Sequence, residues 1–267
     1  MMQTQAIDTK RPPERTAQRT LNRRLFLLTW CAGLPGVITM AWLGVPVLLQ
    51  HQSLPVPTWI VGLASGVQSA LLLALAAFAG AKLAGKVGLR APALAELASG
   101  RAPWAALRPQ CLPGLVGGVF AGVLLWGLIA TAPQAAAPIH GATMPLAVRL
   151  LYGGVTEEVL VRWGLMSLLV WALWRVLRRD ARGDTGTPGA GLVWIAIALS
   201  AVVFGLAHLP AAAGLAGPLA WPVVLHLTAA NAAFGVIAGF LFWRYGLEAA
   251  IIAHLVAHLT LAAIVGR

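Results

Sequence analysis

Long apolar segments, separated by short polar ones, occupy most of this chain. Each has about 18 residues or more, enough for a helix to cross the hydrocarbon core of a bilayer. Their hydrophobicity is continuous, without the alternation of apolar and polar positions that marks the strands of a membrane β-barrel. The pattern therefore predicts an all-α fold, a polytopic bundle of transmembrane helices. The predicted spans cover residues 25–49, 57–81, 112–132, 144–177, 191–208, 218–243 and 247–265.

Two of these segments leave the number of helices at seven or eight. Segment 144–177 has 34 residues and would form a straight helix about 50 Å long. That length exceeds a hydrocarbon core of roughly 30 Å. Segment 218–243 contains Pro222, so it could begin with a short re-entrant piece. Seven spans agree with the charges of the loops, and dividing either segment gives eight.

Composition supports the membrane assignment. Hydrophobic residues make up 59% of the 267 residues and charged residues only 10%, whereas a soluble domain carries about 25% charged residues. An ordinary soluble enzyme is therefore excluded, and so is a disordered chain, which requires low hydrophobicity. On a soluble protein the net charge of +11 would suggest a nucleic-acid partner.

The positive residues instead mark one side of the predicted bundle. Sixteen of the 19 lysines and arginines lie in segments 10–24, 82–108 and 175–182 or at Arg244. The other loops contain none; they are residues 51–56, 133–143 and 209–217. Because positively charged loops stay on the cytoplasmic side, we expect a multi-pass protein of the cell membrane, plasma or inner, with a cytoplasmic N-terminus. The partner of these charges is then the lipid bilayer and not a nucleic acid.

The chain divides into two expected parts. Residues 1–24 form a basic cytoplasmic tail, and residues 25–267 form a single transmembrane domain. The first span is expected to be a signal anchor and not a cleaved signal peptide. Its apolar run is too long for such a peptide, and its leader contains Pro12 and Pro13.

Ionisable side chains inside the predicted spans are the best candidates for function. Each costs on the order of 2.5–3.5 kcal/mol at the centre of an inserted helix, so it is retained where it pairs or acts chemically. The candidates are Arg149, Glu157, Glu158, Arg162, His208, His226, Glu248, His254 and His258. We expect His226 and Glu248 to have structural roles, and Arg149 to snorkel to the outer surface or line a cavity.

Two adjacent acids differ in their expected partners. Glu158 and Arg162 are four residues apart, so they share a helix face and can form an ion pair. Glu157 is rotated by about 100° and has Val161 at the equivalent position. An unpaired carboxyl group in an apolar site suits a general acid or base. The alternative is one buried ion-pair network that only holds helices together.

Three histidines add to this site. His254 and His258 are four apart and present both rings on one face of the last span, while His208 lies near the end of its own span. Neutral imidazole can bind zinc, accept a proton or donate a hydrogen bond to an oxyanion. Along its span His208 is expected nearer the outer surface than Glu157, so a shared site requires a tilted, broken or more deeply starting helix.

The arrangement of these residues resembles that of the CPBP family of intramembrane proteases, which includes the CAAX prenyl endopeptidases and abortive-infection proteins. Residues 157–162, EEVLVR, resemble its EExxxR motif, and residues 204–208, FGLAH, resemble FxxxH. The stretch from Phe234 through Arg244 to His258 resembles the third and fourth motifs. The resemblance covers residues 144–265, which form the protease-like core.

The resemblance implies an intramembrane endopeptidase and a role for each matching residue. Glu157, assisted by His208, would activate the attacking water, and Glu158 with Arg162 would be the supporting pair. His254 and His258 would stabilise the oxyanion. The substrate would be a membrane-anchored or lipid-associated peptide or protein.

Metal dependence stays open at this point. The family has been interpreted both as glutamate-dependent without a metal and as zinc-dependent. If zinc is used, the candidate ligands are Glu157, His208, His254 and His258. Position 258 carries histidine where asparagine is commoner in the family, and two histidines four residues apart can share a metal.

Two functions of other classes compete with the peptidase. A non-catalytic scaffold or chaperone of the same fold would keep the motif residues for packing. A proton-coupled transporter would use Glu157 and the histidines as a relay, although the sequence shows no repeated halves with broken helices.

Overall fold

The described part of the chain is entirely helical. The computed structural model describes residues 12–53, 55–177 and 186–266, with side chains from residue 16 onward, and no strand occurs among them. The α-helices are α1 Pro12–Thr39, α2 Val45–Leu48, α3 Thr58–Leu83, α4 Pro92–Ala98, α5 Trp104–Ala130, α6 Ala137–Gly141, α7 Leu146–Val148, α8 Ser167–Leu177, α9 Ala190–Ala207, α10 Leu209–Ala216, α11 Trp221–Arg244 and α12 Leu247–Val265. Short 3-10 helices are η2 Ala84–Val87 and η3 Gln134–Ala136. The π-helices are η1 Met40–Gly44, η4 Arg149–Glu157 and η5 Val159–Met166.

Seven helical stretches in this part of the chain are long and apolar enough to cross a membrane, which confirms the predicted multi-pass bundle. They are Thr16–Leu48, Thr58–Val87, Trp104–Ala130, Leu146–Leu177, Ala190–Ala216, Trp221–Arg244 and Leu247–Val265. Among the described residues no eighth such stretch forms, because Leu146–Leu177 remains one continuous path through α7, η4, η5 and α8. A π-helix has more residues per turn and advances less per residue, so this long segment fits a single crossing.

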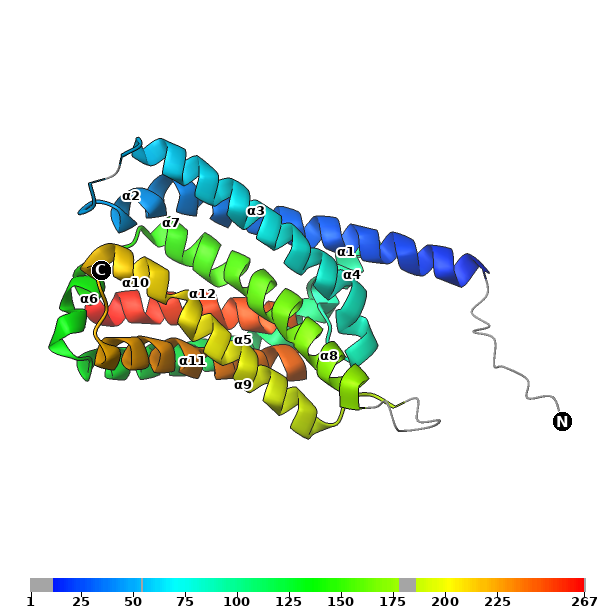
Figure 1. The fold of residues 1–267 in the computed structure, drawn as a ribbon. Coiled ribbons are helices and arrows are strands. Elements are labelled where there is room, and N and C mark those ends of the chain that lie inside the picture. Colours follow the sequence, from blue (N-terminus) through cyan, green and yellow to red (C-terminus); the bar gives the residue numbers. More distant parts are fainter. Residues whose placement is uncertain (1–11, 54, 178–185, 267) are drawn as a thin grey trace.

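The long helices lie side by side, and their ends separate by charge (Figure 1). One end of the bundle carries the start of α1, the helix α4 and the end of α8. Most of the described lysines and arginines lie at this end, whereas α2, α6 and α10 gather at the other end. Lys10, Arg11, Arg178, Arg179 and Arg182 lie outside the described residues. Helix α1 begins at Pro12, so residues 12–24 of the predicted cytoplasmic tail are helical.

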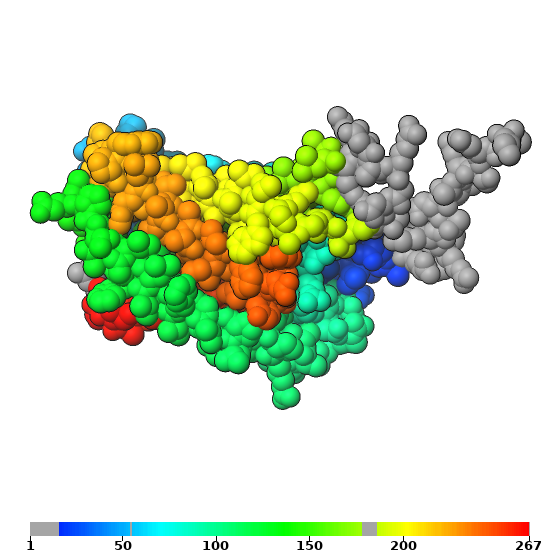
Figure 2. All heavy atoms as spheres, turned by 90° about the horizontal axis from the view of Figure 1, so that it is seen from below, coloured from blue at the N-terminus to red at the C-terminus, as the bar shows by residue number. Residues whose placement is uncertain are grey.

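Glycines allow neighbouring helices to pack closely. Gly114, Gly118 and Gly122 of α5 face α12. A Cβ atom on Gly118 would lie 2.6 Å from Cβ of Val256 and 2.7 Å from the carbonyl oxygen of Ala253. Small residues four positions apart, as at 114–118 and 235–239, allow close helix approach in membranes. The latter pair faces α9, and Figure 2 shows α11 lying between α9 and α5.

The predicted end of the fifth span is wrong. Residues 209–217 were expected to form an external loop, but α10 continues the crossing from Leu209 to Ala216. Pro210 lacks an N–H group, so it interrupts the helical hydrogen bonds; at the first turn of a new helix this loss is harmless. His208 therefore lies at the junction of α9 and α10, and the fold brings its side chain to Glu157.

Glu248 ties two helices together at the charged end of the bundle. It lies in the first turn of α12 and accepts a hydrogen bond of 2.9 Å from the backbone N–H of Leu94. Leu94 is in the first turn of α4, where backbone N–H groups have no partner within the helix. This contact agrees with the structural role expected for Glu248.

Candidate active site

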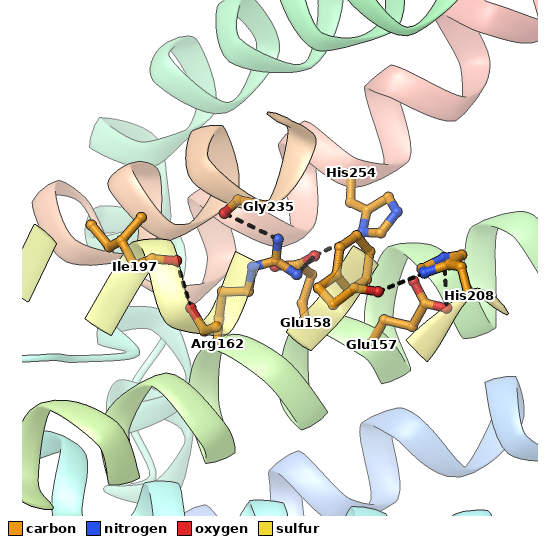
Figure 3. A network of polar contacts seen from close by, with 9 residues as sticks. Glu157, Glu158, Arg162, Ile197, His208, Gly235 and His254 are labelled. Carbon is orange, nitrogen blue, oxygen red and sulfur yellow. Dashed lines mark hydrogen bonds and ion pairs between the residues drawn. The ribbon is translucent and has the colours of Figure 1, made fainter. Parts of the chain in front are cut away.

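Side chains from three membrane-spanning stretches meet inside the bundle (Figure 3). Glu157 ends η4, Glu158 joins it to η5, His208 follows α9 and His254 belongs to α12. The two acids lie where the π-helices η4 and η5 meet. Such π turns inside helices often mark functional sites. The buried Thr156 hydroxyl donates a 2.7 Å hydrogen bond to the carbonyl of Gly33 in α1. This bond fixes the backbone next to Glu157.

Glu158 and Arg162 form the buried ion pair that their spacing predicts. Oε1 of Glu158 lies 3.1 Å from Nη1 of Arg162 and 2.7 Å from Nδ1 of His254. Both members of the pair are almost fully inaccessible to solvent. Glu158 contacts the guanidinium group of Arg162 and the imidazole of His254 at once. It therefore holds η5 and α12 together and orients the ring of His254.

The guanidinium group of Arg162 is held from a third direction. Its Nη2 donates a 3.3 Å hydrogen bond to the carbonyl of Gly235 in α11. The ring centroids of Phe204 and Phe234 lie 4.7 and 5.5 Å from its Cζ atom, so both rings make cation–π contacts. These two aromatic residues open the 204–208 and 234–239 motifs, but sequence reasoning gave them no role. Only the fold shows that both face one arginine.

Glu157 and His208 form the second, more accessible pair. Oε1 of Glu157 lies 4.0 Å from Nε2 of His208, and the two side chains are 18% and 33% exposed. Nδ1 of His208 lies 2.8 Å from the carbonyl oxygen of Phe204. A carbonyl can only accept, so Nδ1 carries a hydrogen and Nε2 of the neutral ring presents its lone pair toward Glu157. The separation is too long for a direct hydrogen bond but suits one bridging water.

The two histidines of α12 lie against each other. Their ring centroids are 4.9 Å apart and the ring planes differ by 21°. Their Nε2 atoms converge above Gly153: a Cβ atom there would lie 2.7 Å from Nε2 of His258 and 3.7 Å from Nε2 of His254. Gly153 precedes Glu157 by four residues in η4, so this space adjoins the two acids. The sequence contains a Gly153-Gly154 pair as its only signal of this close approach.

Arg149 and His226 lie apart from this cluster. Nη2 of Arg149 donates a 3.0 Å hydrogen bond to the backbone carbonyl of His258 and so connects η4 with α12. The ring of His226 contacts that of His140, with centroids 6.3 Å apart. Burial and the neighbouring His226 lower the pKa of His140. The contact of His226 agrees with the structural role expected for it, whereas Arg149 makes a hydrogen bond to α12 that the sequence did not predict.

The observed arrangement does not fit a zinc ion well. A tetrahedral zinc would bring an oxygen and a nitrogen ligand to about 3.3 Å from each other, whereas Oε1 of Glu157 and Nε2 of His208 are 4.0 Å apart. Within the described residues no group of three histidine, cysteine or acidic side chains has a metal-binding arrangement.

A comparison with protein families gives one match. The family model described as type II CAAX prenyl endopeptidase Rce1-like matches residues 139–260. No curated protein and no solved structure matches the chain significantly. The matched segment contains all six of the predicted site residues, and it supports a CAAX-type intramembrane protease acting on membrane-associated proteins.

Proposed function

Because residues 139–260 belong to the Rce1-like family of type II CAAX prenyl endopeptidases, we propose that this chain hydrolyses peptide bonds of membrane-anchored or lipid-associated proteins within the membrane. The observation that carries the proposal is the Glu157–His208 pair. It is partly exposed inside a membrane-spanning bundle, and its two facing atoms are 4.0 Å apart. A carboxylate and an imidazole lone pair at this separation can hold one water molecule between them.

Glu157 is the proposed general base. As the water oxygen attacks the carbonyl carbon of the substrate, a proton passes from water to the Glu157 carboxylate, and Nε2 of His208 accepts a hydrogen bond from the same water. The product of this step is a tetrahedral intermediate with a negative oxygen. Collapse of the intermediate breaks the C–N bond, and the proton on Glu157 passes to the departing amine. Atoms and charge balance without a further reactant.

His254 and His258 are proposed to stabilise the negative oxygen. Their Nε2 atoms converge on the space above Gly153, within one helical turn of Glu157. Donors placed in advance where charge develops lower the barrier, because they need no reorganisation during the reaction. Nδ1–H of His254 donates to Glu158 and fixes the ring. Nε2 of His254 then donates to the substrate oxygen in the protonated, imidazolium form of the ring, which the Glu158 carboxylate favours. Glu158 and Arg162 thus support the site without touching the substrate.

We also propose that the charged end of the bundle faces the cytoplasm of a cell whose plasma or inner membrane holds the protein. The positive charge at that end supports this orientation.

The function can be tested by comparing peptides from cells that carry the native chain, Glu157→Ala or the control Glu96→Gln. Glu96 is at the charged end, where it pairs with Arg101. Peptides released from membrane proteins should appear with the native chain and with Glu96→Gln and should be missing with Glu157→Ala. Identical peptide sets in all three would contradict the peptidase. An intact cellular phenotype with Glu157→Gln would instead favour the scaffold.

A further inference from the structure

A hollow outside the candidate active site lies between α1 and α3, at the charged end of the bundle. Its volume is about 300 Å³. The two helices pack along each other beside it (Figure 1). The lining side chains are Arg19, Asn22, Arg23, Phe26, Phe78, Ala81 and Lys82.

Helical spacing explains why these residues share one hollow. Arg19, Arg23 and Phe26 follow one another at intervals of four and three residues, so they lie on one face of α1. Phe78 and Lys82 are four residues apart and share a face of α3. The two faces meet where the ring centroids of Phe26 and Phe78 lie 6.4 Å apart. The hollow therefore combines cations with an aromatic floor.

Among the described residues, no acidic side chain lines the positively charged hollow. The ion pairs within the described part of the chain involve Glu96, Glu157 and Glu158, and none of these lines the hollow. The ammonium group of Lys82 lies 5.5 Å from the ring centroid of Phe78, a cation–π contact. By contrast, Arg24 on the neighbouring face of α1 donates to the carbonyl of Ala98 in α4.

The floor of the hollow continues into the surface that faces the bilayer. Phe78 is 53% exposed and lies within the apolar stretch Thr58–Val87. An exposed aromatic ring at this position contacts acyl chains, while the cations lie toward the polar headgroups. A ligand that fits both parts has an anionic head and a hydrocarbon tail.

We propose that this hollow binds one anionic phospholipid. The guanidinium groups of Arg19 and Arg23 and the ammonium group of Lys82 would hold its phosphate, since arginine forms paired hydrogen bonds to phosphate oxygens. An acyl chain would pack on Phe26 and Phe78. Basic pockets between transmembrane helices are suited to anionic headgroups. The proposal is independent of the peptidase function.

Native mass spectrometry of the full-length chain in detergent tests this proposal. Phosphatidylglycerol and phosphatidylcholine with identical acyl chains are titrated separately into the native protein and into Arg19→Gln/Arg23→Gln/Lys82→Gln. A control variant, Arg90→Gln/Arg108→Gln/Arg175→Gln, removes the same charge from exposed positions outside the hollow. Thermal unfolding of each variant verifies that it is folded.

The native and control proteins should bind the first phosphatidylglycerol on the order of 10- to 100-fold more tightly than phosphatidylcholine. The variant of the hollow should bind the two lipids equally. An equal loss of preference in both variants, or in neither, would overturn the proposal. Inorganic phosphate at millimolar concentration should not displace the lipid; if it binds the hollow as tightly, the ligand is a free anion and the lipid assignment is wrong.

Discussion

Nε2 of His208 faces Oε1 of Glu157 across 4.0 Å, although the two residues belong to different membrane-spanning stretches. The contact involves the junction of α9 and α10, where His208 lies. It also depends on the hydrogen bond from Nδ1 of His208 to the Phe204 carbonyl, which turns Nε2 toward the acid. The proposed water-activating pair is thus positioned by the backbone as much as by the two side chains.

Replacing Glu157 should affect catalysis far more than folding. Glu157→Gln keeps the shape of the side chain but removes the base, so peptide cleavage should fall by about 10²- to 10⁴-fold. Because Glu157 is partly exposed and outside the Glu158–Arg162 pair, the midpoint of thermal unfolding in detergent should stay unchanged. Cleavage at the native rate would contradict the role of general base.

Breaking the buried Glu158–Arg162 pair should instead lower the stability of the fold. Arg162→Leu leaves the Glu158 carboxylate without its cation in a site that solvent does not reach. Such a change destabilises a fold by about 3–5 kcal/mol, so the unfolding midpoint should decrease markedly. Arg101→Leu breaks the exposed pair with Glu96 and should leave the midpoint unchanged. Equal midpoints for the two variants would show that Arg162 does not stabilise the bundle.

The space above Gly153 provides a separate test of the oxyanion site. In Gly153→Ala the new methyl group would occupy the place toward which Nε2 of His258 and of His254 point. Cleavage should fall by at least about tenfold through kcat, since overpacking of this size displaces side chains at a cost of about 1–3 kcal/mol. Gly127→Ala in α5 is the matched control, because a Cβ atom there meets nothing within 4 Å. Native kcat in Gly153→Ala would contradict this placement.

Position 258 should tolerate a side chain that can still donate a hydrogen bond. We expect His258→Asn to retain most of the cleavage activity, because its amide can replace the imidazole N–H. His258→Ala should lose about 10²- to 10³-fold in kcat, the usual effect of removing one oxyanion donor. The hydrogen bond from Arg149 to the backbone carbonyl of residue 258 does not require the imidazole ring. Similar kcat values for the asparagine and alanine variants would argue against a donor role.

Much of the site could be predicted because charged residues are rare in membrane helices. Their cost in an apolar environment makes Glu157, Glu158 and Arg162 conspicuous, and the four-residue spacing predicts the Glu158–Arg162 pair that the structure contains. The same reasoning identified His208 and His254, which the fold brings to these acids. The long apolar segments likewise predicted the seven membrane-spanning stretches.

Other features depend on packing that no local pattern determines. The predicted fifth span ended at residue 208, whereas α10 follows from Leu209 with Pro210 in its first turn, because proline is disfavoured only where a helical N–H is needed. The π-helices η4 and η5 arise in a segment whose pattern predicts a helix but does not distinguish a π-helix from an α-helix. The two rings on Arg162 come from separate helices, so their meeting follows from the bundle and not from sequence spacing.

The most direct test of the central claim is cleavage by purified protein. A membrane protein whose fragments disappear in Glu157→Ala cells would be reconstituted into liposomes with either the native chain or Glu157→Gln, and the fragments would be measured over time. The account predicts that the native chain alone produces the same fragment as in cells. No cleavage by the native chain, or equal cleavage by Glu157→Gln, would contradict it.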